Sequence, residues 1–365
     1  MDKIDDTTLK NIKNKISEFQ KQHKDIIILL VINLKSEITD APNNCFDYET
    51  EFFSLEELND FINALNQLEV YHDISYGEND FINKVSSGYF MRFKQKYKIV
   101  YNTTGSKRIR AHSALIPSIC ELYNIAYASS DILTTSILEN KLYSFATLGY
   151  HGFNIPKYWI YHNIHGWIHS RQPSQGIMLI AKPAYECASI GITSDSVSYF
   201  NDNFNEYIKN IADTLRQPVI VQEFIRGWEV EVPIFDIGEC PFVPSVVGIQ
   251  IGGHKFLNNK FLPYEAVYSD NYKFYDYGMI NPLLAEHIKK IATESYKTMD
   301  LLGTVRVDFR ISDQNVPYIT DYNNSPHLTR FHSCAKSIEY FGLNYLDMFC
   351  LIFYKTLHKI ISIKK

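Results

Sequence analysis

The chain has 365 residues and a mass of 42.4 kDa, which exceeds the usual size of a single core and predicts two or three domains. Hydrophobic residues make up 45% and charged residues 21%, values that exclude an intrinsically disordered or fibrous chain. The 36 Lys and Arg residues against 41 Asp and Glu residues give a formal charge of -5. The chain therefore lacks the basic field of a nucleic-acid-binding surface.

The six cysteines are scattered and form no CxxC pair, which argues against a zinc site or a disulfide framework and predicts reduced thiols. The N-terminal residues are polar, so no signal peptide is expected. The longest apolar run, residues 26–32, has the length of a strand and is far too short to cross a bilayer. These features predict a cytoplasmic protein without a membrane partner.

Helices and strands alternate in the first part of the chain, which predicts an N-terminal α/β domain over residues 1–130. The apolar run at residues 25–33 indicates a strand buried on both faces. Ser54 followed by Glu57 fits a capping box that begins a helix. The other elements expected here are a helix over 7–23, a strand over 97–101 and a helix over 114–123.

Two further units follow, and their patterns differ. Residues 131–217 are predicted to form a small central lobe, with a helix from Asp131 through Phe145, strands at 158–161 and 176–183, and a helix at 204–215. Residues 218–365 are richer in antiparallel signals. The elements expected there are strands at 219–224, 229–235, 244–251, 305–311 and 316–322, and helices at 282–301 and 345–357. The fold class predicted is mixed, α/β and α+β, in three lobes.

Four polar residues at the predicted hairpin form the sharpest candidate site. Alternation along a strand places Arg306 and Asp308 on one face, and Asp321 and Asn323 on one face of the partner strand. If the two faces coincide, two carboxylates, an amide oxygen and a guanidinium converge. Hard oxygen ligands suit Mg2+, which commonly bridges carboxylates and nucleotide phosphates. A surface hairpin with a ladder of salt bridges is an equally open interpretation of these four residues.

Two lysines and one connecting segment give weaker signals. Lys182 ends an apolar strand beside a loop of small residues, where it could meet phosphate oxygens, although most such lysines extend to solvent. Lys141 lies inside a predicted helix, where a solvated face is the simpler interpretation. Residues 219–231 run from strand to strand, and such a connection can bind the edge of a heterocycle or form a plain turn.

Taken in order, these segments resemble the ATP-grasp superfamily, most closely its D-alanine–D-alanine ligase-like branch. The resemblance runs from about Tyr101 to the C-terminus. It implies a three-lobed ATP-grasp architecture with an N-terminal α/β domain, a small central lobe and a C-terminal mixed lobe. The matching segments are residues 101–102, 116–130, 139–141, 180–183, 186–191, 221–229, and the hairpin residues 306, 308, 321 and 323.

The resemblance also implies a reaction and a role for each matching residue. In this family ATP phosphorylates a substrate carboxylate, and an amine attacks the acyl phosphate to give an amide, ADP and phosphate. Small-molecule acid and amine substrates are therefore the expected partners, ATP and Mg2+ (or Mn2+) the expected cofactors, and a homodimer a common assembly. The roles implied are catalysis for Arg306; ATP binding for Lys141, Lys182, Glu186, Ser189, Gln222, Glu223, Ile225 and Glu229; metal binding for Asp308, Asp321 and Asn323; and substrate binding for Tyr268, His327 and Ser333.

Some ATP-site residues depart from the family pattern. Cys187 and Ala188 stand in the phosphate loop where Gly and Ser are expected. Gln222 replaces the usual hinge glutamate, although its amide oxygen can still accept a hydrogen bond from the adenine amino group. Asp321 replaces a glutamate metal ligand and is one methylene shorter.

The departures on the substrate side are larger. Val267 stands in the mobile loop where the ligases carry a lysine, and His327 stands where they have a glycine that helps to bind the acceptor carboxylate. The N-terminal domain lacks the glycine-rich turn that receives the first D-alanine. These differences predict a substrate other than D-alanine.

Three functions stay open at this point. The first is an ATP-dependent carboxylate–amine ligase for a substrate other than D-alanine. The second is a true D-alanine–D-alanine ligase with drifted motifs. The third is a nucleotide-binding regulator or scaffold without turnover, against which the presence of both lysines, Arg306 and all three metal-ligand positions argues.

Overall fold

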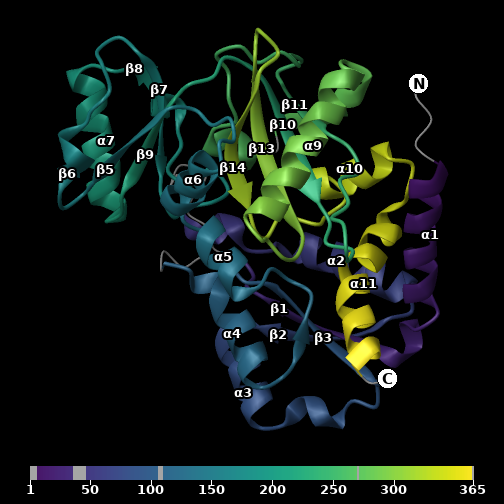
Figure 1. The fold of residues 1–365 in the computed structure, drawn as a ribbon. Helices are drawn as coiled ribbons and strands as arrows, with labels where there is room; N and C mark the ends of the chain where they lie inside the picture. The colour runs from purple at the N-terminus through teal and green to yellow at the C-terminus, as the bar shows by residue number, and fades with distance from the viewer. Residues whose placement is uncertain (1–5, 36–46, 106–109, 269–270, 364–365) are drawn as a thin grey trace.

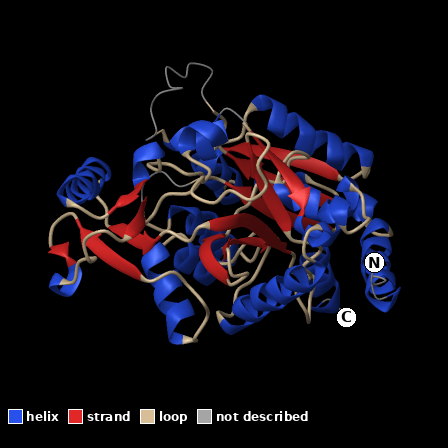
Figure 2. Cartoon of the chain, turned by 90° about the horizontal axis from the view of Figure 1, so that it is seen from above, coloured by secondary structure: helices blue, strands red, loops and turns tan. Residues whose placement is uncertain are grey.

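The computed structural model describes residues 6–35, 47–105, 110–268 and 271–363. Within these residues the strands form three sheets, one in each of three lobes (Figure 1). Figure 2 shows the helices covering the faces of these sheets. The predicted mixed α/β and α+β fold in three lobes is confirmed.

The N-terminal lobe is built on a parallel sheet of order β2-β1-β3-β4. Its central strand is buried along its whole length, and successive residues enter two different cores. Ile28 and Leu30 pack with helices α1, α2 and α11, whereas Ile27 and Leu29 pack with α3 and α4. The elements are α1 (Asp6–Gln20), β1 (Ile26–Ile32), α2 (Leu55–Gln67), β2 (Tyr71–Tyr76), α3 (Gly77–Ser86), β3 (Tyr97–Thr103), α4 (Leu115–Leu122) and β4 (Ala126–Tyr127).

The central lobe carries an antiparallel sheet of order β6-β5-β9-β7-β8, packed against α7. Strand β9 pairs with both β5 and β7. The predicted boundary between residues 217 and 218 therefore falls just before a strand of this sheet, and the division into domains stays a prediction. The elements are β5 (Tyr158–His162), β6 (Gly166–Trp167), β7 (Met178–Pro183), β8 (Val197–Tyr199), α7 (Asp202–Leu215) and β9 (Val219–Glu223).

The C-terminal lobe carries an antiparallel sheet of order β12-β11-β10-β13-β14. Helix α9 packs on it, and the last helix, α11, instead joins the core of the N-terminal lobe. The chain thus returns to its first lobe, which ties the lobes together (Figure 1). The elements are β10 (Gly227–Ile234), β11 (Val247–Ile251), α8 (Tyr264–Tyr268), β12 (Tyr272–Asp276), α9 (Pro282–Thr298), β13 (Val305–Ser312), β14 (Pro317–Asn323), α10 (Ser333–Tyr340) and α11 (Tyr345–Ile363).

One predicted helix is wrong in a way that matters for the site. The helix expected from Asp131 through Phe145 is two helices, α5 (Ile132–Leu138) and α6 (Lys141–Tyr150). Asn140 separates them because its side chain accepts a hydrogen bond from the Leu142 N–H and begins a new helix. Lys141 is therefore the first residue of α6 rather than part of a helix interior.

The predicted capping box is confirmed. Ser54 and Glu57 form the capping box of α2, with hydrogen bonds in both directions. The five cysteines in the described part of the chain are free, and Cys45 lies outside it. None of the helices described is long and apolar enough to cross a membrane.

Candidate active site

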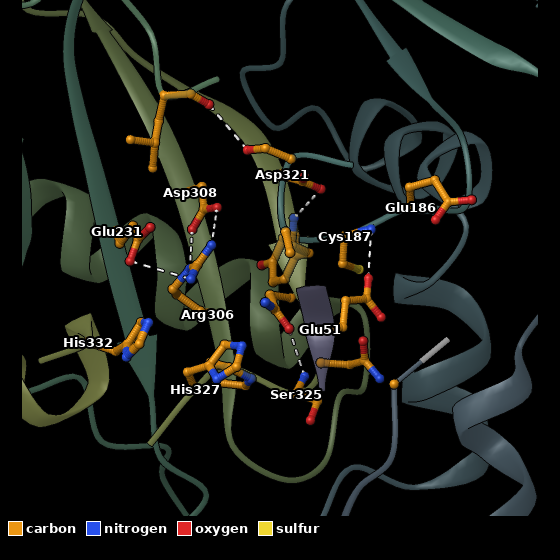
Figure 3. A pocket seen from close by; sticks show the side chains of 18 of the residues that line it. Glu51, Glu186, Cys187, Glu231, Arg306, Asp308, Asp321, Ser325, His327 and His332 are labelled. Carbon is orange, nitrogen blue, oxygen red and sulfur yellow. Dashed lines mark hydrogen bonds and ion pairs between the residues drawn. The ribbon is translucent and has the colours of Figure 1, made fainter. Parts of the chain in front are cut away.

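A pocket lies where the three lobes meet (Figure 3). The C-terminal lobe supplies the β13–β14 hairpin, the central lobe supplies the end of β7 and the loop after it, and the N-terminal lobe supplies Glu51, Phe53 and residues 103–105. The predicted residues that line the pocket are Lys141, Lys182, Glu186, Ser189, Glu229, Arg306, Asp308, Asp321, Asn323 and His327.

The hairpin places its four polar residues as the sequence predicts. Arg306 lies opposite Asn323, and Asp308 lies opposite Asp321, in the antiparallel register of β13 and β14. A register shift between Asp308 and Phe309 follows directly. Because all four side chains line the same pocket, the two strand faces coincide.

Arg306 is held in the pocket by two carboxylates. Its Nε and Nη2 donate to Asp308 at 2.7 and 2.8 Å, and its Nη1 lies 3.4 Å from Glu231. Glu231 is buried, and burial raises the pKa of its carboxyl above the usual range even though Arg306 acts in the opposite direction. The bidentate contact fixes the plane of the guanidinium.

Lys141 joins the central lobe to the hairpin. Its Nζ donates to both Asp321 oxygens at 3.0 and 2.9 Å, and the residue is only 3% exposed. Burial alone would lower the pKa of Lys141, but the Asp321 carboxylate raises it above its ordinary value. Lys182 donates to the Thr320 carbonyl at 3.0 Å, and burial lowers its pKa. Two buried ammonium groups thus contact neighbouring residues of β14.

The predicted phosphate loop adopts a glycine-like backbone at two residues that are not glycine. Ala188 and Ser189 have φ angles of 48° and 57°, in the left-handed region. Non-glycine residues there cost about 1 kcal/mol each, and such strain concentrates at functional sites. Glu186 accepts a hydrogen bond from Gln217 at 2.6 Å, and the N–H of Cys187 donates to Glu51 from the N-terminal lobe at 3.1 Å (Figure 3).

The predicted adenine hinge lies beside the pocket rather than in its lining. Gln222 pairs through its backbone with Ile180, which does line the pocket. Gln222 is 1% exposed, and its side-chain amide has no hydrogen-bond partner among the residues that the structure describes. Glu223 and Ile225 are also absent from the lining, and the Ile225 carbonyl accepts from Arg310. The roles of these three residues stay predictions.

Glu229, the predicted ribose carboxylate, is fixed by Arg310. The guanidinium donates to the Glu229 carboxylate at 2.7 Å, to the carbonyls of Lys260 and Asn258, and to the Ile225 carbonyl already described. Arg310 is itself buried, so it holds Glu229 in one orientation at the pocket wall.

The predicted substrate residues are only partly brought together. His327 lines the pocket, where its ring stacks between those of Phe53 and His332. Ser333 is buried outside the lining, and its side chain acts to lower the pKa of the Glu231 carboxyl. Tyr268 belongs to α8, but its side chain and that of Val267 lie outside the described part of the structure.

Sequence reasoning missed several residues of this pocket. Glu231 could have been found, because it follows Glu229 at the two-residue spacing of a strand face. His332 follows His327 by five residues but carries no signal of its own in the sequence. Burial and His327 lower its pKa well below the usual range. Glu51 and Glu139 come from distant segments, and burial raises the pKa of Glu139 to about 7.

With this geometry in view, comparison with known proteins decides the family. The family model described as D-ala D-ala ligase C-terminus matches residues 152–353, more than half of the chain. The chain belongs to the D-alanine–D-alanine ligase family. It is accordingly an ATP-grasp enzyme, an ATP-dependent ligase that forms a carbon–nitrogen bond.

Individual relatives are distant. A D-alanine–D-alanine ligase of Bordetella avium is 25% identical over 236 residues, which cover 64% of this chain and 70% of the relative. One of Pseudothermotoga lettingae is 24% identical over 263 residues, which cover 70% and 79%. These matches place the ligase within the family at low identity.

Solved structures share the fold over nearly the whole chain. The D-alanine–D-alanine ligase from Bacillus anthracis complexed with ATP gives a TM-score of 0.67 at 16% identity and covers 92% of this chain and 99% of that one. The VanG D-Ala:D-Ser ligase from Enterococcus faecalis gives 0.64 at 17% identity and covers 90% and 99%. The predicted ATP-grasp architecture is confirmed.

The donor set at the hairpin fits a hard cation. Asp308, Asp321 and Asn323 offer carboxylate and amide oxygens on one pocket face, the ligand type that Mg2+ prefers. Both carboxylates also accept from cations, Asp308 from Arg306 and Asp321 from Lys141. Burial raises the pKa of Asp321, but Lys141 and Lys182 outweigh this and lower it, so the carboxylate stays ionised.

We predict that Asp321→Asn destabilises the ligand-free enzyme. Removing one partner of a buried ion pair leaves the Lys141 ammonium without its counter-ion, at a cost of about 3–5 kcal/mol in the free energy of unfolding. The double variant Lys141→Met, Asp321→Asn should recover most of that loss because no charge is stranded. Denaturant unfolding of the wild type, both single variants and the double variant measures this coupling. Equal stability of all four would mean that the pair contributes nothing to the fold.

Proposed function

We propose that this ligase uses ATP and Mg2+ to phosphorylate a substrate carboxylate, couples the acyl phosphate to an amine other than D-alanine, and releases ADP and phosphate. The observation that carries the proposal is the convergence of Lys141, Lys182, Arg306, Asp308 and Asp321 on one pocket face. Two ammonium groups, a guanidinium and two carboxylates at one place match the charge pattern of a metal–polyphosphate complex.

The residues divide the work by charge and position. Lys141 and Lys182, both buried, would neutralise phosphate oxygens, and the strained loop at Ala188 and Ser189 would present backbone N–H groups to them. Asp308, Asp321 and Asn323 would hold Mg2+, which withdraws electron density from the transferred phosphoryl group. Arg306, held by Asp308, would donate to the oxyanion that forms when the amine attacks.

Two contacts made by the N-terminal lobe also favour exclusion of water from the pocket during the reaction. Glu51 of the N-terminal lobe bonds to the phosphate loop, and Thr50 bonds to the buried Tyr264 of α8 at 2.9 Å. The first contact joins the N-terminal lobe to a loop that lines the pocket, and the second joins it to α8, which follows the lining residues Phe261 and Leu262. An acyl phosphate hydrolyses in water, so closure of this kind protects it.

The surroundings of His327, a residue predicted to bind the amine substrate, support an amine other than D-alanine. A glycine leaves room for a small carboxylate beside the backbone, whereas His327 fills that position with a ring that stacks against Phe53 and His332. Behind this wall, Glu57 lies 3.5 Å from the His327 Nδ1 and places an acidic group next to the ring. A larger amine that stacks on an aromatic ring fits this wall better than D-alanine.

A true D-alanine–D-alanine ligase is the second candidate function. It is favoured by the relatives, which are D-alanine–D-alanine ligases in Bordetella avium and Pseudothermotoga lettingae. In that case His327 would turn away from the acceptor and the loop would leave room for D-alanine. The two candidates share the ATP chemistry and differ only in the pocket wall.

The role of Arg306 can be tested by replacing its planar guanidinium with an ammonium group of the same charge. Arg306→Lys keeps the charge but removes the planar fork, so kcat should fall by about 100-fold with little change in the KM for ATP. Arg310→Lys is the matched control, since Arg310 holds the predicted ribose carboxylate and should affect mainly the KM for ATP. Steady-state kinetics distinguish the two. A rise in the KM for ATP alone in Arg306→Lys would make Arg306 a nucleotide ligand.

A screen of acid and amine pairs at saturating ATP tests the substrate. We expect ADP and phosphate release with an amine larger than D-alanine, slow turnover with D-alanine as both substrates, and about tenfold faster D-alanine coupling in His327→Gly. Nucleotide analysis and mass spectrometry of the product are the measurements.

Each unexpected result of this screen has a definite meaning. Efficient D-alanine coupling by the wild type, unchanged in His327→Gly, would establish the second candidate. Release of AMP and pyrophosphate would refute the acyl-phosphate mechanism. A chain that binds ATP but turns over no pair in the screen would favour a regulatory role.

A further inference from the structure

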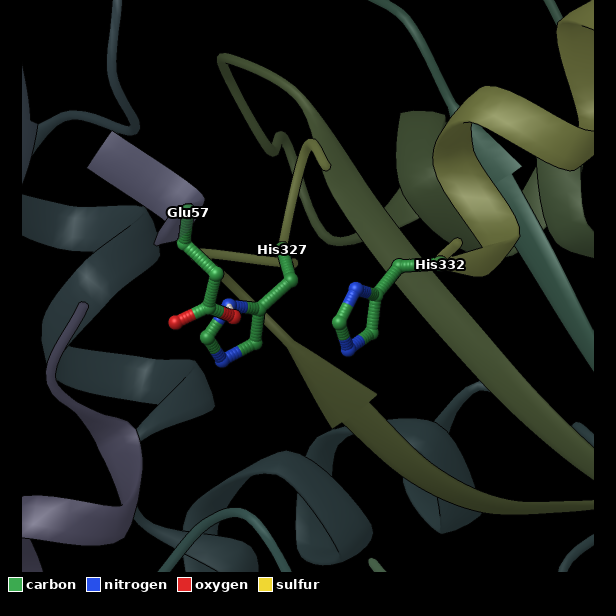
Figure 4. Close-up of side chains that lie close together, drawn as sticks. All are labelled: Glu57, His327 and His332. Carbon is green, nitrogen blue, oxygen red and sulfur yellow. Dashed lines mark ion pairs between the residues drawn. The ribbon is translucent and has the colours of Figure 1, made fainter. Parts of the chain in front are cut away.

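Two histidines and a glutamate gather beside the pocket, apart from the residues predicted to bind ATP. Glu57 comes from the first turn of α2, His327 from the loop after β14, and His332 from the residue that caps α10 (Figure 4). One ligand atom of each lies within 4.8 Å of those of the other two. Among the described residues, this is the one group of three His, Cys, Asp or Glu side chains with that spacing.

In two of the three side chains, those of Glu57 and His332, one polar atom contacts a neighbour, and this contact orients the side chain. Glu57 accepts the Ser54 N–H on Oε2 at 2.7 Å and turns Oε1 toward His327 Nδ1, at 3.5 Å. Lys35 approaches the same Oε2, at 4.0 Å. The His332 Nδ1 lies 2.5 Å from the Thr329 hydroxyl, which leaves its Nε2 for another partner. Partners of this kind orient the ligands of natural metal sites.

The loop that carries both histidines is fixed to α2 by other contacts. The Arg330 guanidinium donates to Asp60 at 3.0 Å, and the Arg330 N–H donates to the same carboxylate. Asp60 lies three residues after Glu57 and therefore near the same side of α2. The positions of His327 and His332 relative to Glu57 are thus set by the fold.

We propose that Glu57, His327 and His332 bind a divalent transition-metal cation of the zinc class, separate from the magnesium predicted at the hairpin. Two imidazoles and one carboxylate are a frequent ligand set for Zn2+, with a further position open to water or substrate. Ligand atoms around Zn2+ stand about 3.4 Å apart at bond lengths of about 2.1 Å. The 3.5 Å between Glu57 and His327 already matches, and small side-chain rotations close the remaining gap.

Such a cation would lie at the pocket wall, because His327 and His332 both line the pocket. Its open position would accept a carboxylate, amine or thiol of the acceptor. This inference does not depend on the proposed reaction, since metal binding is measured without turnover.

The test is a titration of the tag-free, metal-free enzyme with Zn2+ by calorimetry, and with Co2+ by visible absorption, in excess Mg2+. We expect one Zn2+ per chain and Co2+ bands of a low-coordinate site. Glu57→Gln and His332→Ala should each weaken Zn2+ binding by about 100-fold or more. Glu57→Gln is the cleaner variant, because glutamine also completes a capping box and keeps α2 intact.

Two controls make the result decisive. His165→Ala removes a histidine from the His162–His165 pair, whose rings are 4.7 Å apart on the central lobe, and should leave the binding unchanged. Asp308→Asn should also leave it unchanged, since the partner of the Asp308 carboxylate is Arg306 rather than one of the three proposed ligands. The proposal fails if the wild type takes up no stoichiometric Zn2+, or if binding survives Glu57→Gln in a folded protein, or if it is lost in His165→Ala or Asp308→Asn.

Discussion

The ion pair between Lys141 and Asp321 is the interaction on which the site depends. Lys141 begins α6, its N–H donates to the Ala184 carbonyl beyond the end of β7, and its ammonium reaches Asp321 on β14. One residue therefore ties the central lobe to the hairpin of the C-terminal lobe. A buried ammonium needs a carboxylate, so the fold brings the lobes together at the place where a polyphosphate would need the same cation.

Elsewhere in the pocket, charged side chains are also held in ion pairs. A bound ligand can take the place of one partner in such a pair. Arg306 is shared by Asp308 and Glu231, and Glu229 is held by Arg310. Pairing keeps these side chains ordered and satisfied in the ligand-free enzyme. A metal–nucleotide complex brings both signs of charge and can therefore replace several contacts at once.

The sequence predicts the fold and the placement of the hairpin residues well, for physical reasons that differ between residues. Alternation along β13 and β14 determines the face of Arg306, Asp308, Asp321 and Asn323, and the register needs only a hairpin. The burial of β1 follows from its unbroken apolar run. The sequence wrongly predicts that Lys141 lies in a helix interior, because the helical pattern around it conceals the cap at Asn140 that begins α6.

The group of Glu57, His327 and His332 could not be predicted in the same way. It depends on the contact between α2 and a loop about 270 residues later in the chain, such as that between Asp60 and Arg330. No periodicity in the sequence indicates a contact between segments so far apart in the chain. The capping box identified Glu57 as a helix-start residue but gave no hint that its second oxygen faces a histidine.

The central claim is that the charges at the hairpin form a nucleotide–metal site rather than a structural ladder of salt bridges. Calorimetric titration of the wild-type enzyme with ATP, in the presence and absence of Mg2+ and without other substrates, tests it most directly. The account predicts one ATP per chain, bound at least about tenfold more tightly with Mg2+. Absence of ATP binding, or an affinity that Mg2+ does not change, would contradict it.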